Sequence, residues 1–147
     1  MKIAIHQPNF IPWYPFFQKV KEADIFIILT HCQFEKNNYQ NRFNVNNQWY
    51  TMRVKKGMDN IINKTYVNPI YDWNKIKKGF PKLNKITSNF DECITDNLAI
   101  TNINIIKKAC ELLNITTKIK FDFPTDLNIF NLNYLKKKIL KLHIKLI

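Results

Sequence analysis

The first part of the chain alternates between patterns typical of strands and of helices. The segment from Lys2 to His6 is short and largely apolar, as in a strand buried within a parallel sheet. Apolar residues then recur at helical spacing, and Pro15 fits only the first turn of a helix, so a helix is predicted to begin there. A second apolar, β-branched run from Asp24 to Leu29 predicts another strand. A strand, a helix and a second strand within about 30 residues form a parallel βαβ unit, which indicates an α/β fold.

The middle of the chain is less regular. Residues 30–47 are polar and aromatic without a clear period, which predicts a long loop. Alternation from Trp49 to Val54 predicts a strand after this loop. Residues 55–90 have no dominant period, and we expect only a strand at Thr65–Val67 followed by a turn at Asn68-Pro69.

Periodicity returns in the last third of the sequence. An apolar face from Asn102 to Leu113 predicts a helix, with Thr101 or Asn102 as its N-cap. Residues 116–123 then predict a strand. From residue 131 to 147, leucine and isoleucine form one stripe and lysines cover the rest, which predicts a basic amphipathic helix.

No repeat, linker or low-complexity tract divides the chain, so one domain over residues 1–147 is expected, with a Rossmann-like parallel sheet and flanking helices. No apolar run reaches the roughly 18 residues that a membrane helix needs. The N-terminus has too few apolar residues before His6 for a secretory signal, so a cytoplasmic location is expected. Cys32, Cys93 and Cys110 are odd in number and widely spaced, which is typical of reduced thiols.

The formal net charge is +12 and comes almost entirely from lysine, since Arg42 and Arg53 are the two arginines. Arginine's planar guanidinium usually reads base edges and binds phosphates in pairs, so specific nucleic-acid recognition is not expected. An alternative function stays open: a basic binding module whose lysines and C-terminal helix bind nucleic acid or an anionic membrane surface. Steep salt dependence would mark that function.

Two polar clusters follow the first two predicted strands. His6-Gln7-Pro8-Asn9 follows the first strand, and a second cluster runs from Gln33 to Arg42. Because the carboxyl ends of parallel strands meet at one edge, where open sheets bind ligands, we expect the clusters to lie together. His6 can act as an acid or base, and Lys36 and Arg42 suit a phosphate or carboxylate. The alternatives are a buried histidine bonded to loop backbone and a solvated loop.

Phosphate-binding loops of the common kinds are absent. The chain contains no GxGxxG, GxxxxGK[ST] or GxSxG sequence, and Gly57 and Gly79 lie far from the first strand. The amide side chains of Gln33, Gln40 and Asn41 can instead orient hydroxyls or a base.

The residues IAIHQPNFIPW, FFQKVKEADIFIIL and QFEKNNYQNR, all within residues 3–42, resemble the start of the WbqC-like family. The family pattern has a strand running into HQPN and an aromatic residue, then proline and tryptophan, an aromatic pair, Ala-Asp before a strand, and QF, Lys and QNR. The matching residues are His6, Gln7, Pro8, Asn9, Pro12, Trp13, Phe17, Ala23, Asp24, Gln33, Phe34, Lys36, Gln40, Asn41 and Arg42. Later similarity is thinner, in WYTMRVKKG and NINIIKKACELLNITTKI.

The resemblance implies a transferase-like enzyme of bacterial surface polysaccharide (O-antigen) biosynthesis that binds an activated anionic small molecule such as a nucleotide-linked sugar. It identifies neither a cofactor nor an oligomeric state. We expect His6 and Asn9 to be catalytic. The expected substrate-binding residues are Gln7, Trp13, Gln33, Lys36, Gln40, Asn41 and Arg42. No metal is expected because the histidines are not spaced as a ligand set, although His6, His31 and Cys32 can meet at the sheet edge.

The sequence also departs from the family pattern. Pro15 stands where the family commonly has glycine, Thr30 where aspartate is common, and Phe43 where asparagine often follows the arginine. Thr30 removes a carboxylate from the strand edge, and the histidine expected soon after Trp73 is missing. The family typically continues through a further helix and strand, so we expect a C-terminally shortened chain. An inactive, truncated relative is therefore a further alternative.

Overall fold

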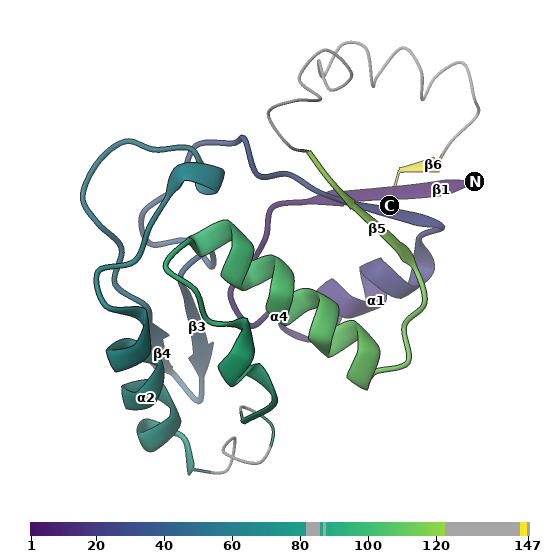
Figure 1. Cartoon of the computed structure of the whole chain (residues 1–147). Coiled ribbons are helices and arrows are strands. Elements are labelled where there is room, and N and C mark those ends of the chain that lie inside the picture. Colours follow the sequence, from purple (N-terminus) through teal and green to yellow (C-terminus); the bar gives the residue numbers. More distant parts are fainter. Residues whose placement is uncertain (82–85, 87, 123–144, 147) are drawn as a thin grey trace.

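The apolar runs of the sequence form a parallel sheet (Figure 1). The computed structural model describes residues 1–81, 86, 88–122 and 145–146. Within them the sheet has the order β5-β2-β1-β6, with strands β1 (Lys2–His6), β2 (Ile25–Ile28), β5 (Lys118–Phe121) and β6 (Lys145–Leu146). This arrangement confirms the predicted α/β fold and matches the order 3-2-1-4 of a Rossmann sheet.

The strand β6 corrects one prediction. Most of the helix predicted for residues 131–147 lies outside the described residues, but Lys145 and Leu146 pair in parallel with Lys2 and Ile3 of β1. The helix prediction is therefore wrong at that end. Pairing there satisfies backbone groups of β1 that would otherwise form an open sheet edge, a gain that the apolar stripe does not reveal.

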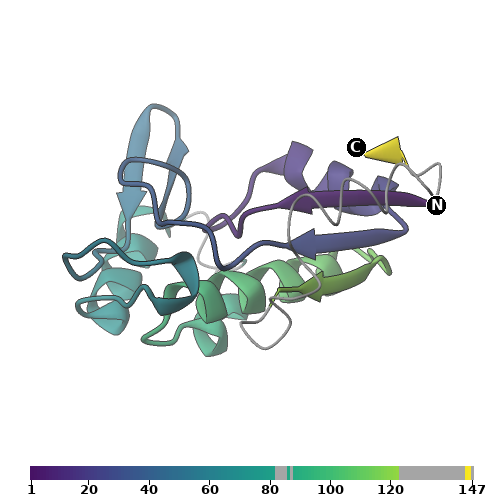
Figure 2. The same cartoon turned by 90° about the horizontal axis from the view of Figure 1, so that it is seen from above.

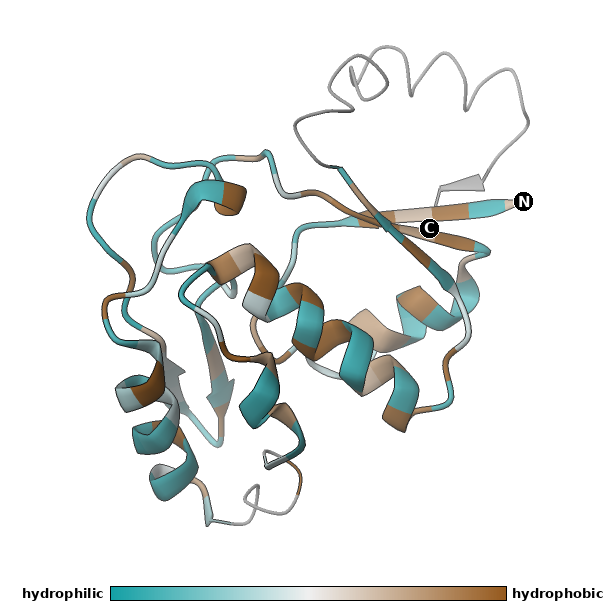
Figure 3. Ribbon diagram, in the orientation of Figure 1, coloured by the Kyte–Doolittle hydropathy of each residue, from teal (hydrophilic) through white to brown (hydrophobic). Residues whose placement is uncertain are grey.

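Two helices, α1 (Tyr14–Glu22) and α4 (Leu98–Leu112), cover one face of the sheet (Figures 1 and 2). Side chains alternate across a strand, so Ala4 and Phe26 face the same side. They are buried against apolar residues of both helices: Phe16, Phe17, Val20, Ile103, Ile106 and Cys110. Apolar and polar bands recur along α4 (Figure 3), as in a helix with one apolar face.

The two helices differ in how well their starts were predicted. Pro15 lies in the first turn of α1, as expected from its fixed φ and missing N–H. In α4 the N-cap is Asn97, whose side-chain oxygen accepts a hydrogen bond from the Ile100 amide at 2.9 Å. The predicted caps, Thr101 and Asn102, are wrong because both lie inside the helix and are buried.

A hairpin lies beside the N-terminal end of α4 (Figure 1). Strands β3 (Arg42–Val45) and β4 (Gln48–Thr51) are antiparallel, and the turn between them has Asn46 and Asn47 at φ 52° and 63°. Two positive φ values in a two-residue connection match the twist of a hairpin, and asparagine tolerates them. The loop predicted for residues 30–47 thus ends in a strand, and the strand predicted for 49–54 ends at Thr51.

A second apolar core joins this hairpin to α2 (Pro69–Gly79), the 3₁₀ turns η1 (Ile61–Asn63) and η3 (Ser88–Cys93), and α4. The turn predicted at Asn68-Pro69 is wrong: Asn68 caps α2 by accepting from the Tyr71 amide at 3.1 Å, and Pro69 begins the helix. The strand predicted at residues 65–67 forms only isolated bridges. Because α4 contributes to both cores, it fixes the hairpin relative to the sheet.

Candidate functional site

His6 ends β1, beside the reversal in strand order between β1 and β6. Open α/β sheets bind ligands at the carboxyl ends of strands next to such a reversal. His6 Nδ1 lies 2.7 Å from the carbonyl oxygen of Gln7, which can only accept, so Nδ1 carries the proton. Burial lowers the pKa of His6; the Gln7 carbonyl raises it and Lys19 lowers it. His6 is therefore largely neutral near pH 7, with Nε2 free of a proton and able to accept one.

The two polar clusters predicted from the sequence are hydrogen-bonded to each other. Gln40 Nε2 donates to Gln7 Oε1 at 2.7 Å. Asn102 of α4 donates through Nδ2 to the carbonyl oxygens of Pro8, at 2.9 Å, and of Gln40, at 2.7 Å. The segments after β1 and before β3 therefore lie side by side, and a buried helix residue holds both.

Gln40 and Asn41 use their amides on the protein's own groups. Gln40 Oε1 accepts a hydrogen bond from the Glu35 amide at 3.0 Å, and Asn41 Nδ2 donates to the Met52 carbonyl at 2.8 Å. Both side chains are buried. In this arrangement they position the polypeptide around the site.

A pocket of about 700 Å³ opens between the segment after β1 and the β3-β4 hairpin, and we call it the aromatic pocket. Trp13, Tyr39 and Trp49 in its lining are 70%, 50% and 43% exposed. Exposed rings beside amides suit a ligand that has both apolar faces and hydroxyls. The full lining is Asn9, Phe10, Ile11, Pro12, Trp13, Tyr39, Phe43, Asn44, Val45, Asn47, Trp49 and Phe80.

Arg42 lies against one wall of the aromatic pocket. Its guanidinium carbon is 4.0 Å from the centroid of the Trp49 ring, within the range of a cation–π contact. Arg42 Nε donates to the Asn38 carbonyl at 3.3 Å, and a terminal nitrogen donates to the Asn37 carbonyl. These contacts fix the orientation of the arginine beside the pocket.

The structure does not gather all predicted site residues in one place. Asn9 and Trp13 line the aromatic pocket. His6 lies at the end of β1, outside that lining, with its ring packed edge-on against Phe16 at 5.1 Å between centroids. Gln33 and Lys36 are exposed and are not part of the lining, although Gln33 forms an isolated β-bridge with Asn60.

A buried carboxylate lies at the sheet edge beside Thr30. Asp122 directly follows β5; its Oδ1 accepts from the Thr30 amide at 2.6 Å, and its backbone carbonyl accepts from Thr30 Oγ1 at 2.6 Å. Its Oδ2 pairs with Nδ1 of His31. Sequence reasoning missed this group, because the pairing of Ile28 with Phe121 that sets Asp122 beside Thr30 joins segments far apart in the chain.

Cys32 lies next to this group and has the character of an ordinary thiol. Burial raises the pKa of Cys32, a hydrogen bond with Gln7 lowers it, and the charges of Asp122 and Glu35 raise it. The net shift is upward, so the thiol stays protonated near pH 7. Nucleophilic cysteines have the opposite shift.

The comparisons with known proteins concern nearly the whole of this chain. The model of the WbqC-like protein family matches residues 7–142. The chain belongs to the WbqC-like protein family. The matched residues include the first polar cluster from Gln7 onward, the whole of the second cluster, the hairpin and α4.

A relative of this WbqC-like chain occurs in Mycobacterium tuberculosis (strain ATCC 25618 / H37Rv), under the name "Uncharacterized protein Rv1507c". It is 28% identical over 137 residues, and the alignment covers 80% of this chain and 58% of the relative. The WbqC-like chain thus spans somewhat more than half of that relative's length. No solved structure matches the chain significantly.

Two further observations apply to the part of the WbqC-like chain that the structure describes. No helix there is long and apolar enough to cross a membrane. Histidine, cysteine, aspartate and glutamate form no group of three or more there that is placed to hold a metal ion.

Proposed function

We propose that this WbqC-like chain binds an activated sugar, such as a nucleotide-linked sugar, in the aromatic pocket. It would act as a transferase-like enzyme of surface polysaccharide (O-antigen) biosynthesis in the bacterial cytoplasm. The observation that carries this proposal is the pocket's lining, in which three exposed aromatic rings lie beside asparagine side chains. Family membership supports it, because the match includes every pocket residue.

The lining suits the two kinds of surface that a sugar presents. The rings of Trp13, Tyr39 and Trp49 offer flat apolar faces for the C–H side of a pyranose. Asn9 and Asn44 each provide an acceptor oxygen and an NH₂ donor for hydroxyl groups. These amides fix the orientation of a ligand that the rings hold by contact.

The anionic part of the ligand is assigned to Arg42 and Lys36. Arg42 is held beside Trp49 and has donors beyond the two contacts made to backbone carbonyls. Lys36 lies in the segment between β2 and β3 and is exposed. It forms no ion pair in the described part of the chain, so it can move toward a bound anion without breaking one. The net charge of +12 favours the approach of such a ligand.

His6 lies outside the lining of the aromatic pocket but only three residues before Asn9, which lines it; we assign the proton transfer to His6 and the orientation of the reacting group to Asn9. The neutral ring takes the proton of an acceptor hydroxyl at Nε2 while the hydroxyl oxygen forms its bond to the sugar carbon. The bond from that carbon to the anionic leaving group breaks, and the leaving group departs with the electron pair. The lowered pKa of His6 keeps the base unprotonated before the reaction.

Binding of nucleotide sugars, measured by isothermal titration and tryptophan fluorescence, tests the proposal. We expect at least one uridine-, thymidine- or guanosine-diphosphate sugar to bind, and Trp13→Ala to weaken it about tenfold or more. Tyr14→Ala is the matched control, because Tyr14 is an exposed aromatic next to Trp13 that does not line the pocket. A folded wild-type protein that binds no such compound, or equal loss in both variants, would overturn the proposal.

A further inference from the structure

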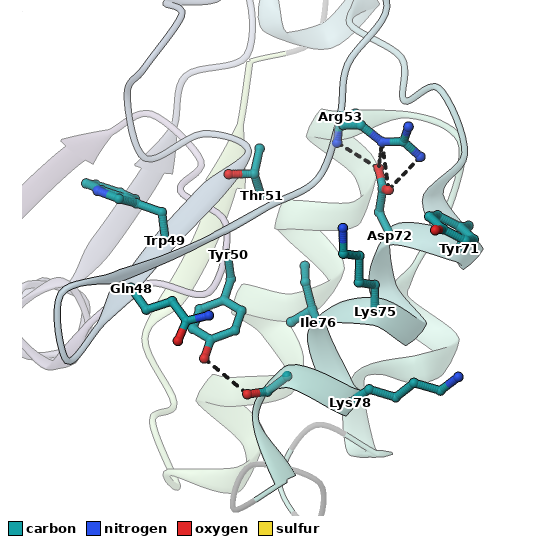
Figure 4. A pocket seen from close by; sticks show the side chains of 11 residues that line it. Gln48, Trp49, Tyr50, Thr51, Arg53, Tyr71, Asp72, Lys75, Ile76 and Lys78 are labelled. Atoms are coloured by element: carbon teal, nitrogen blue, oxygen red, sulfur yellow. Dashed lines mark hydrogen bonds and ion pairs between the residues drawn. The ribbon is translucent and has the colours of Figure 1, made fainter.

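A second pocket, also of about 700 Å³, lies on α2 and β4 (Figure 4). Its lining contains three cationic side chains, Arg53, Lys75 and Lys78, and one carboxylate, Asp72. We call it the cationic pocket. Trp49 is the residue that it shares with the lining of the aromatic pocket.

Arg53 is held in place by Asp72 and still faces solvent. Its backbone amide donates to Asp72 Oδ2 at 2.8 Å, and its Nε and one terminal nitrogen contact Oδ1 at 2.9 and 2.8 Å. The Asp72 side chain is 4% exposed and that of Arg53 55%, so the carboxylate is buried behind the guanidinium. The hydrogen bonds from Arg53 to Asp72 raise the pKa of Arg53, which stays charged. In the described part of the chain, Nη1 keeps its donors for a ligand.

Lys75 and Lys78 add charge that nothing described neutralises. They are three residues apart on α2, both are exposed, and neither forms an ion pair within residues 1–81, 86, 88–122 and 145–146. Residues at this spacing lie on the same face of a helix, so their like charges repel each other. An anion bound between them removes that repulsion, whereas Lys77 on the same helix already pairs with Asp91 at 2.9 Å.

The walls of the pocket are fixed and include stacking surfaces. The Tyr50 hydroxyl donates to the Gly79 carbonyl at 3.2 Å, which ties β4 to the end of α2 (Figure 4). Tyr71 is exposed, and the Arg53 guanidinium lies 5.5 Å from its ring centroid. A fixed guanidinium and two ammonium groups that form no ion pair in the described part of the chain are features with which proteins bind phosphate groups.

We propose that the cationic pocket is a second ligand site, which binds the phosphate or diphosphate group of an anionic ligand. Arg53 contacts the phosphate oxygens through Nη1, Lys75 and Lys78 neutralise the remaining charge, and Asp72 holds the arginine in place. The site shares only Trp49 with the lining of the aromatic pocket and does not depend on sugar binding there. It gives the protein a place for a second phosphorylated compound.

Titration with inorganic pyrophosphate and inorganic phosphate tests this site, and substitution of its lysines distinguishes binding there from binding at Arg42 and Lys36. At constant ionic strength we expect wild type to bind pyrophosphate, and the double variant K75Q/K78Q to bind it about tenfold more weakly. Lys77→Gln is the matched control, because it also removes an α2 charge, but one outside the pocket lining. We expect it to stay within about twofold of wild type.

Trp13→Ala separates this proposal from the one for the aromatic pocket. Trp13 lines only the aromatic pocket of the two, so the variant should bind pyrophosphate as wild type does. Pyrophosphate binding that fails in wild type, or that falls equally in K75Q/K78Q and Lys77→Gln, would overturn the cationic site. Sugar-nucleotide binding that fails while pyrophosphate binding persists would overturn only the proposed function.

Discussion

Gln40 and Gln7 join side chain to side chain, with Gln40 Nε2 donating to Gln7 Oε1 at 2.7 Å. The two residues belong to the segments that follow β2 and β1, which share one edge of the sheet. Gln40 is fully buried, so its amide has no access to solvent as an alternative partner. The bond is therefore part of what holds the wall of the aromatic pocket in place.

Gln40→Ala should lower the free energy of unfolding by about 1–3 kcal/mol, because it leaves Gln7 Oε1 and the Glu35 amide without their partner. Urea unfolding measures this change. Gln18→Ala, at an exposed position of α1, is the control and should stay within about 0.5 kcal/mol of wild type. Equal effects of the two substitutions would contradict a structural role for the bond.

Asn47 offers a test of the hairpin turn. Its φ of 63° lies in the left-handed region, which glycine adopts without strain and β-branched residues adopt at a cost. Asn47→Val should lower the free energy of unfolding by about 1–2 kcal/mol, whereas Asn47→Gly should leave it nearly unchanged. Thermal unfolding compares the two. A valine variant as stable as the glycine variant would mean that the turn has another geometry in solution.

Thr30→Val should destabilise the sheet edge by about 1–3 kcal/mol while preserving side-chain shape. Thr30 Oγ1 donates to the Asp122 carbonyl at 2.6 Å, and both residues are buried, so valine leaves that acceptor unpaired. Thr51→Val, at an exposed strand position, is the control and should change stability little. Chemical unfolding measures the free energy of unfolding of each variant. A decrease no greater than in the control would exclude this hydrogen bond as a stabilising contact.

How far the sequence predicts the fold depends on whether a signal is local. The first strand, α1 and β2 follow from periodicity and from Pro15, because these features act within one element. The turn predicted at the start of α2 is wrong because Asn68-Pro69 has the composition of a turn as well as of an N-cap and first helical residue. In α4, Thr101 and Asn102 are residue types that cap helices as Asn97 does, so composition alone does not identify the N-cap.

The candidate site divides in the same way. Parallel strand topology predicts that the two polar clusters meet, and the Gln7–Gln40 bond joins them. Topology does not predict which side chains face outward: Gln40 and Asn41 are buried, and the exposed rings of Tyr39 and Trp49 carry no motif that distinguishes them from core aromatics. The sequence does not predict Asp122 as a neighbour of Thr30, because this carboxylate follows a strand far along the chain.

The lowered pKa of His6 predicts a specific dependence of stability on pH. Burial, the largest cause, takes the folded-state pKa below the ordinary 6.5, so the unfolded chain binds a proton more readily than the folded one. The stabilising contribution is complete above the unfolded pKa and is lost as the pH falls toward the lower folded pKa, below which the loss levels off. His6→Asn keeps an N–H donor for the Gln7 carbonyl but cannot titrate.

Urea unfolding of wild type and His6→Asn between about pH 5 and 8 should therefore show a smaller decline at acid pH in the variant. Groups that titrate in both proteins cancel in the difference, which isolates His6. Proton NMR of the imidazole gives the folded pKa directly and should place it below 6.5. A measured pKa at or above that value, or parallel pH curves for the two proteins, would mean that His6 is not held neutral by burial. His6 would then be partly protonated before the proposed reaction, and its assignment as the base would be wrong.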